Sequence, residues 1–147
     1  MKELDFKEKY NEVMERLDKE NTIVLATSDK DIVSARSVWY VLYKSSIYFF
    51  TSPAWEKIKQ IKKNPNVALC LDNIQLKGIA IIKGHPTLKE NETIVDYCQK
   101  KHAGIGDYNM KRKNMVLIEV KINKIEMWIK HGREHIDISE KKAYRIG

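Results

Sequence analysis

Cysteine is scarce in this sequence: Cys70 and Cys98 are the only two among its 147 residues. Two cysteines are too few for a disulfide framework or for the ligands of a structural zinc ion, which favours the reducing cytoplasm. No apolar run approaches the length that crosses a bilayer. The first ten residues, MKELDFKEKY, lack the apolar centre of a signal peptide. These absences predict a cytoplasmic protein.

The composition is that of a folded globular protein, with 43% hydrophobic and 32% charged residues. A chain of this length fits one domain over residues 1–147, and it contains no internal repeat, linker or low-complexity segment. The net charge of +7 favours an anionic partner. Charge alone does not choose between a nucleic acid and a small phosphate.

The N-terminal third predicts a helix followed by antiparallel strands. Residues 5–20 are expected to be helical, because Phe6, Tyr10 and Leu17 share one face at helical spacing and Asp5 is a suitable N-cap. The segments TIVLAT, IVSARSVWYVLY and SIYFFT follow, rich in branched and aromatic residues and separated by short turns. This pattern is typical of a β-meander.

The rest of the chain predicts further strands with short helices between them. A helix is expected over 53–63, with Ser52 as its N-cap and Pro53 as its first residue. A second is expected in ETIVDYCQKK, followed by a loop, AGIGDY. The last strands, MVLIEVKI and KIEMWI, are expected to meet at a turn at Asn123. With about six or seven antiparallel strands and no βαβ alternation, the predicted fold class is a mainly β small barrel with short helices.

The stretch TSPAWEKIKQIKK, residues 51–63, is a candidate phosphate site. A helix N-terminus offers free N–H groups and partial positive charge, Thr51 and Ser52 add hydroxyl groups, and Lys57 adds a positive charge. The alternative is an ordinary helix cap with a solvated lysine face.

Arg36 is a second candidate, because it interrupts an otherwise nearly uncharged strand. An unpaired buried guanidinium is costly, so this side chain is expected to face water or a partner. The functional interpretation is an anion clamp, since the planar guanidinium suits phosphate. The alternative is an arginine on a surface or at a sheet edge.

The C-terminal segment EMWIKHGREHID supplies further candidates. Trp128 either walls a planar ligand or belongs to the core. His131 and His135 are four residues apart, but a glycine lies between them and no third ligand is evident, so no metal site is predicted. The pair Cys98 and His102 lacks an orienting third group and is weak evidence for a nucleophile.

Basic clusters follow residue 56 and residue 110, in the segments KIKQIKK and KRK. They could contact a nucleic-acid backbone. Neither cluster has interleaved aromatic residues or a base-reading motif, which favours a solvated face over a nucleic-acid partner.

The order of these segments resembles the pyridoxamine 5′-phosphate oxidase-like family of FMN-binding split β-barrels. The resemblance rests on LATS, the strand SARSVW, the strand end YFFTS, a helix containing Lys57, NPNV and a strand ending in a glycine turn. It covers about the central half of the chain and, more weakly, MVLIEVKINKIEMW. The small general-stress and nitroimidazole-reductase-like members are the most similar.

The resemblance implies a homodimer with FMN at the subunit interface. Its cofactor-binding positions are taken over residue by residue. The phosphate contacts correspond to Arg36, Thr51, Ser52 and Lys57; backbone near the isoalloxazine ring corresponds to Ser37 and Val38; and an aromatic residue beside the flavin corresponds to Trp128.

Arg133 and His135 resemble the R-x-H pattern that grips the phosphate of the vitamin substrate in true oxidases. This chain departs from the family pattern in having Glu56 directly before Lys57, and the acidic Asp137 after the R-x-H segment. These differences predict that pyridoxamine phosphate is a poor substrate.

The sequence therefore predicts an FMN-dependent oxidoreductase of unknown small-molecule substrate, with its catalytic residues unidentified. Three alternatives stay open. They are a flavin carrier or sensor without fast turnover, a related barrel that binds deazaflavin or haem, and a basic nucleic-acid-binding protein.

Overall fold

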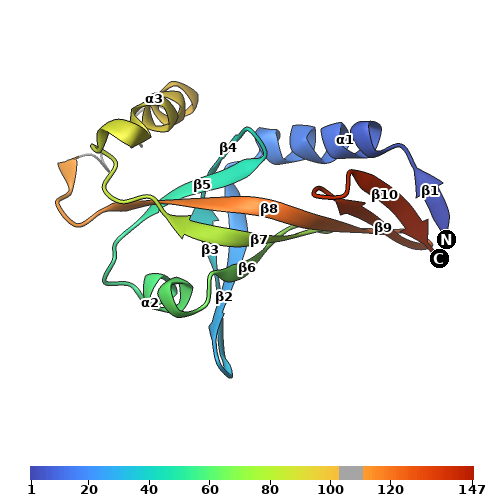
Figure 1. The fold of residues 1–147 in the computed structure, drawn as a ribbon, viewed down its shortest axis with the longest axis horizontal. Coiled ribbons are helices and arrows are strands. Elements are labelled where there is room, and N and C mark those ends of the chain that lie inside the picture. The colour runs from blue at the N-terminus through green and yellow to red at the C-terminus, as the bar shows by residue number, and fades with distance from the viewer. Residues whose placement is uncertain (103–110) are drawn as a thin grey trace.

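The structure is a computed structural model that describes residues 1–102 and 111–147, and strands dominate it (Figure 1). In chain order the elements are β1 (Lys2–Leu4), α1 (Phe6–Lys19), β2 (Thr22–Asp29), β3 (Ile32–Trp39), β4 (Val41–Tyr43), β5 (Ser46–Thr51), α2 (Glu56–Lys63), β6 (Asn66–Leu71), β7 (Ile74–Ile82), the 3₁₀ turn η1 (Lys89–Asn91), α3 (Glu92–Lys101), β8 (Val116–Ile129), β9 (Gly132–Asp137) and β10 (Lys142–Ile146). The predicted loop AGIGDY lies outside the described residues. In the described ranges, no helix combines the length and apolar character needed to span a membrane.

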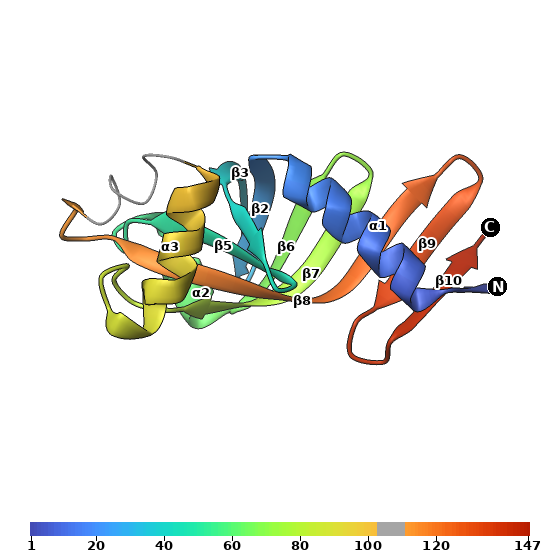
Figure 2. The same ribbon diagram turned by 90° about the horizontal axis from the view of Figure 1, so that it is seen from above.

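All strand pairs are antiparallel, in the order β1-β10-β9-β8-β7-β6-β2-β3. The sheet branches at β8. One edge of β8 pairs with β7, while the other pairs first with β5 and then with β9, so β9 and β10 extend away from the barrel (Figure 2). The predicted mainly β class is confirmed. The described residues form ten strands rather than six or seven. Strands β1, β9 and β10 were not anticipated, the predicted strand 32–43 is divided into β3 and β4, and the two predicted last strands form the single strand β8.

The predicted turn at Asn123 is wrong, because β8 runs through it without a break. Ile122 pairs with Gly78 and Lys124 pairs with Lys77, which leaves Asn123 as the extra residue of a β-bulge. Its carbonyl oxygen accepts a hydrogen bond from the backbone N–H of Ile138, 3.0 Å away. At Gly78 a Cβ atom would lie 2.4 Å from the carbonyl oxygen of Lys121, so this close approach requires glycine.

The predicted first helix is confirmed as α1, with Asp5 as its N-cap. The Asp5 carboxylate accepts a hydrogen bond from the N–H of Glu8 at 2.8 Å, as an N-cap does. Leu17 is fully buried, and its carbonyl oxygen accepts a hydrogen bond from the hydroxyl of Tyr40 at 2.5 Å. Tyr40 lies between β3 and β4, so this bond fixes the bend that divides the predicted long strand.

Glu134 joins α1 to the C-terminal strands. The side chain is buried on β9, and its carboxylate accepts hydrogen bonds from Lys9 on α1 at 3.1 Å and from Arg145 on β10 at 2.7 Å. Burial alone would raise the pKa of Glu134, but the hydrogen bonds from Arg145 and Lys9 outweigh it and lower the pKa below its usual value. The ionised carboxylate therefore stabilises the attachment of β9 and β10.

We expect Glu134→Gln to lower the free energy of unfolding by about 1–3 kcal/mol at neutral pH, since it weakens two charge-assisted hydrogen bonds. A depressed carboxyl pKa stabilises the fold above the unfolded pKa of about 4.3 and loses this effect as pH falls through the folded pKa. Urea unfolding from pH 7 to pH 3 should therefore show the difference between variant and parent shrinking in acid. Glu140→Gln, at an exposed turn, is the control. A difference that stays constant with pH would contradict the role given to Glu134.

Candidate functional site

Arg36 lies on β3, the terminal strand of the sheet order, with its side chain anchored to β2. Its Nη1 donates hydrogen bonds to the hydroxyl of Thr27 at 2.8 Å and to the carbonyl oxygen of Leu25 at 3.2 Å. The Thr27 hydroxyl in turn donates to Oε1 of Gln60 on α2 at 2.5 Å. This network of Arg36, Thr27 and Gln60 joins two strands to α2 and fixes the position of the guanidinium.

The connection from β5 to α2 differs from its prediction. Ser52 is not the helix N-cap, because α2 begins at Glu56 and its N-cap is Trp55, with no side-chain capping bond. Residues 52–55 instead form a turn closed by a 3.2 Å hydrogen bond from the N–H of Trp55 to the carbonyl oxygen of Ser52. The Ser52 hydroxyl accepts a hydrogen bond from the N–H of Ala54 at 3.3 Å. Proline at position 53 suits such a turn as well as the first position of a helix, so the local sequence fits both the predicted helix start and the observed turn.

Thr51 carries a buried polar group without a partner. The residue is fully buried at the end of β5, and its Oγ1 has no hydrogen-bond partner among the described residues. A buried hydroxyl that lacks a partner costs free energy. Its position, directly before the turn that leads to Lys57, makes it a candidate ligand contact.

The Lys57 residue is buried, with only 9% of its surface exposed. Its ammonium lies 4.2 Å from the ring centroid of Trp55. Burial and the charge of Arg36 lower the pKa of Lys57, and burial lowers the pKa of Arg36, with the charge of Glu56 opposing this. In the described part of the chain, neither cation forms an ion pair with a carboxylate. Two neighbouring cations without a carboxylate partner in the described residues are a candidate site for an anion.

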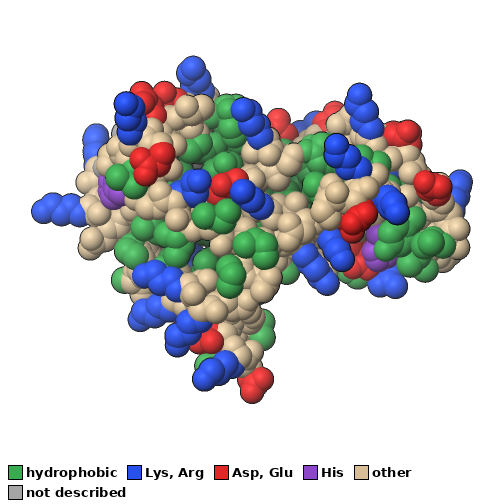
Figure 3. Space-filling view, viewed as in Figure 1, with side chains coloured by type: hydrophobic (Ala, Val, Ile, Leu, Met, Phe, Trp, Pro, Cys, Tyr) green, Lys and Arg blue, Asp and Glu red, His purple; other side chains and the backbone are tan. Residues whose placement is uncertain are grey.

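The exposed surface around α2 is also basic. Figure 3 shows Lys and Arg side chains gathered over α2 and the nearby end of the β2–β3 hairpin. On α2 the exposed lysines are Lys59, Lys62 and Lys63, and of these Lys63 lies 3.4 Å from Asp29. These side chains differ from Lys57 because water solvates them.

Ser37 and Val38 face opposite sides of β3. Val38 is buried, whereas Ser37 is exposed. Within the described residues β3 pairs only with β2, so backbone N–H and C=O groups along its other edge have no strand partner. An unpaired strand edge can hydrogen-bond a planar ligand or a second chain.

Trp128, Arg133 and His135 form a separate group at the far end of β8. Thr51 pairs with Val116 at the start of β8, and Trp128 lies twelve residues later, about 40 Å along an extended strand. Trp128 is 48% exposed and pairs with Arg133 on β9. One chain therefore does not bring Trp128 and its neighbours Arg133 and His135 together with Thr51.

The sequence did not identify Gln60, Thr27 or Glu126 as functional candidates. Gln60 could have been found, because it lies between Ile58 and Ile61 on α2 and a polar residue beside buried isoleucines indicates a buried hydrogen bond. Thr27 has no such signal, since threonine is common in strands. Glu126 is recognisable only from the pairing of β8 with β9, where its carboxylate lies 2.8 Å from Arg133 Nη1.

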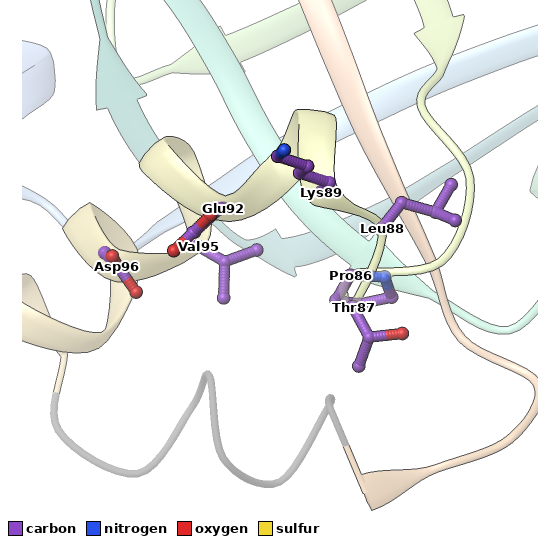
Figure 4. Close-up of a pocket in the computed structure, with 7 residues that line it drawn as sticks. All are labelled: Pro86, Thr87, Leu88, Lys89, Glu92, Val95 and Asp96. Atoms are coloured by element: carbon purple, nitrogen blue, oxygen red, sulfur yellow. The ribbon is translucent and has the colours of Figure 1, made fainter.

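Other chemical candidates gain no support. Burial raises the pKa of Cys98 to about 11, so its thiol is not activated as a nucleophile. Within residues 1–102 and 111–147, no three His, Cys, Asp or Glu side chains cluster as metal ligands would. A groove of about 280 Å³ lies beside α3, lined by residues 86–89 and by three residues of α3 (Figure 4). It contains none of the predicted site residues.

We expect Thr27→Val to lower the free energy of unfolding by about 1–3 kcal/mol, because Gln60 Oε1 loses its donor and Arg36 Nη1 loses one of its two acceptors. Valine matches threonine in shape, so the loss reports hydrogen bonding rather than packing. Urea unfolding is the measurement, and Thr22→Val, at an exposed position of the same strand, is the control with an effect within about 0.5 kcal/mol. Equal effects of the two substitutions would refute the network.

Comparison with solved structures shows a shared fold. Campylobacter jejuni ChuZ aligns with a TM-score of 0.77 at 18% identity, over 98% of this chain and 64% of ChuZ, so this chain spans less than two thirds of that protein. An FAD-binding protein from Mesorhizobium loti aligns with a TM-score of 0.63 at 16% identity, over 78% of this chain and 90% of that one. The heme storage protein HutZ from Vibrio cholerae aligns with a TM-score of 0.65 at 11% identity, over 82% and 92%.

These likenesses confirm the split β-barrel fold that the sequence predicts. No curated protein matches the sequence. The sequence pattern of pyridoxamine 5′-phosphate oxidase, however, matches residues 9–129, which include β2 to β7, α2 and all of β8. On that match, the chain belongs to the pyridoxamine 5′-phosphate oxidase family.

Proposed function

We propose that this protein binds FMN as a homodimer and acts as a flavin-dependent oxidoreductase on a small molecule. One observation carries the proposal: Lys57, which is buried, and Arg36, which is partly buried, are neighbouring cations without a carboxylate partner among the described residues. A doubly charged phosphate would offset both charges, and the free hydroxyl of Thr51 would donate to it. The residues present therefore fit the phosphate of FMN.

The ring system of FMN would lie along β3. Its unpaired edge offers backbone donors and acceptors beside Ser37 and Val38, which suit the polar edge of an isoalloxazine. A bound flavin supplies the redox chemistry, while the chain binds and orients it. The network through Thr27 and Gln60 would hold Arg36 in place before the ligand arrives, which reduces the entropy lost on binding.

A second subunit is part of the proposal because one chain leaves the site incomplete. Trp128 lies about 40 Å along β8 from the residue that pairs with Thr51, too far to stand beside a flavin whose phosphate binds at Thr51 of the same chain. The outer face of β3 exposes large apolar side chains, Val33 and Trp39, which a partner would cover. Strands 33–43 and 116–129 are the proposed lining of the shared interface, and ligand sites are common at such interfaces.

The visible spectrum of the purified protein tests the cofactor. Bound oxidised flavin gives a yellow protein, whereas haem gives a Soret band. FMN added to colourless protein should bind and be reduced by a chemical donor. A Soret band, or no uptake of FMN, would overturn the proposed cofactor.

We expect Lys57→Met to weaken FMN binding by about 1.5–3 kcal/mol and to leave riboflavin binding almost unchanged, because riboflavin has no phosphate. Methionine keeps the packing of the lysine stem, and removing an uncompensated buried charge should not destabilise the apoprotein. Fluorescence titration with both ligands is the measurement, and Lys62→Met on the exposed face of α2 is the control. Arg36→Ala should show the same preference. Equal losses for FMN and riboflavin would mean that the phosphate lies elsewhere.

The shared site predicts that FMN quenches the fluorescence of Trp128 in the dimer. Trp128→Phe should reduce the total quenching on titration of the apoprotein with FMN, because the ring would stand beside the flavin of the partner subunit. Trp39 and Trp55 contribute their own quenching, so Trp55→Phe is the comparison. Sedimentation at micromolar concentration should show a dimer. A monomer, or unchanged quenching in Trp128→Phe, would contradict the shared site.

A further inference from the structure

The outer face of the C-terminal strands carries an aromatic and cationic surface, which we term the C-terminal platform. Glu126 on β8 pairs with His135 on β9, and His135 pairs with Tyr144 on β10. Trp128 and Arg133 form the next cross-strand pair. Paired residues lie on the same face of a sheet, so these five side chains are neighbours on one surface.

Glu126 holds the centre of the C-terminal platform. Its Oε1 lies 2.8 Å from Arg133 Nη1 and 3.8 Å from His135 Nε2. The Nε2 atom of His135 is buried and has no hydrogen-bond partner among the described residues. The imidazole itself stacks on the ring of Tyr144, with centroids 4.9 Å apart and planes 9° from parallel. One carboxylate oxygen therefore faces both groups that could receive an anion.

A phosphate approaching Arg133 and His135 would meet this carboxylate. To bind, it would have to displace Glu126 from Arg133 and then lie beside a like charge. Like charges brought together at a binding surface are strongly unfavourable, and such a repulsive group sets specificity by rejecting the wrong ligand. The half-exposed ring of Trp128, next to Arg133, does not depend on charge and still offers a face to a planar molecule.

We propose that Glu126 is a specificity-determining residue that excludes phosphorylated substrates, so that the C-terminal platform takes a planar ligand without negative charge. The inference rests on the proposed function, because it assigns the substrate class of the same flavin-dependent site. It explains why Arg133 and His135 are expected to bind an anion only weakly. The guanidinium of Arg133 already has a carboxylate partner.

The test compares pyridoxamine 5′-phosphate with pyridoxamine as probes, by calorimetric titration of the FMN-loaded protein. The parent should bind the phosphorylated probe no more tightly than the other. Glu126→Gln, which keeps the size of the side chain and removes its charge, should raise affinity for the phosphorylated probe at least about tenfold. Affinity for pyridoxamine should not rise, and inorganic phosphate should compete with the phosphorylated probe.

Two further variants test whether the effect of Glu126→Gln is specific to this position and depends on Arg133. Glu140→Gln removes the same charge from an exposed turn and should leave the ratio of the two affinities at the parental value. Adding Arg133→Gln to Glu126→Gln should abolish the gain, because the phosphate then lacks its guanidinium. An unchanged ratio in Glu126→Gln, or a parent that already prefers the phosphorylated probe, would overturn the inference. Flavin absorbance reports separately whether FMN binds, and failure of FMN to bind would overturn the proposed cofactor. The ratio of the affinities for the two probes can still be measured on the apoprotein, and it then decides the role of Glu126.

Discussion

The pairing of β8 is the constraint on which the rest of this structure depends. This strand of 14 residues pairs with β7 along one edge and divides the other between β5 and β9. A strand that satisfies its backbone groups in two branches of one sheet must be long, and its length separates the two halves of the molecule. The Asn123 bulge lies where the pairing changes from β5 to β9, and it increases the local twist that turns the C-terminal strands away from the barrel.

The two ends of β8 carry different chemistry. Thr51 pairs with the beginning of β8 and leads to Lys57, where a buried lysine and a half-buried arginine lie together without an acidic partner in the described chain. At the end, an arginine has such a partner in Glu126, and Glu134 on the opposite face joins Lys9 and Arg145. The cations that join the C-terminal strands to one another and to α1 are therefore each paired with an acidic residue. The unbalanced pair at Arg36 and Lys57 is therefore unusual within this molecule, and a ligand explains it better than stability does.

Dimerisation would bring together the two groups of residues that β8 keeps apart within one chain. A strand edge at β3 and exposed apolar side chains on its outer face are unfavourable in an isolated chain. A second copy would cover the apolar side chains and bring the C-terminal platform of one chain towards the phosphate site of the other, while the ring of FMN would hydrogen-bond the backbone groups of the β3 edge. The same arrangement would exclude water from a bound ring, which strengthens each polar contact within the site.

Local sequence was enough to identify the elements whose signals are local. The helical spacing in α1, its Asp5 cap and the amphipathic segment of α3 all appear at their predicted places, because capping and burial of one face act within a few turns. The resemblance also placed Arg36 within a strand, Thr51 at the end of the next strand and Lys57 on a helix, where β3, β5 and α2 have them. In contrast, the N-cap assigned to Ser52 was wrong, since a turn and a helix start use the same residue types.

Other features depend on pairing between distant segments, which local sequence does not encode. The strands β9 and β10 were not predicted, because their buried residues, such as Glu134 and Ile136, alternate with polar and charged residues. These buried residues lie on the face of β9 whose Glu134 pairs with Lys9 of α1. Asn123 looked like a turn, and only the register of β7 against β8 makes it a bulge. By itself the sequence determined the fold class and singled out candidate residues for a phosphate site. The tertiary structure decided which charges are buried without a partner and that Glu126 neutralises Arg133, because burial and ion pairing arise only when separate strands are brought side by side.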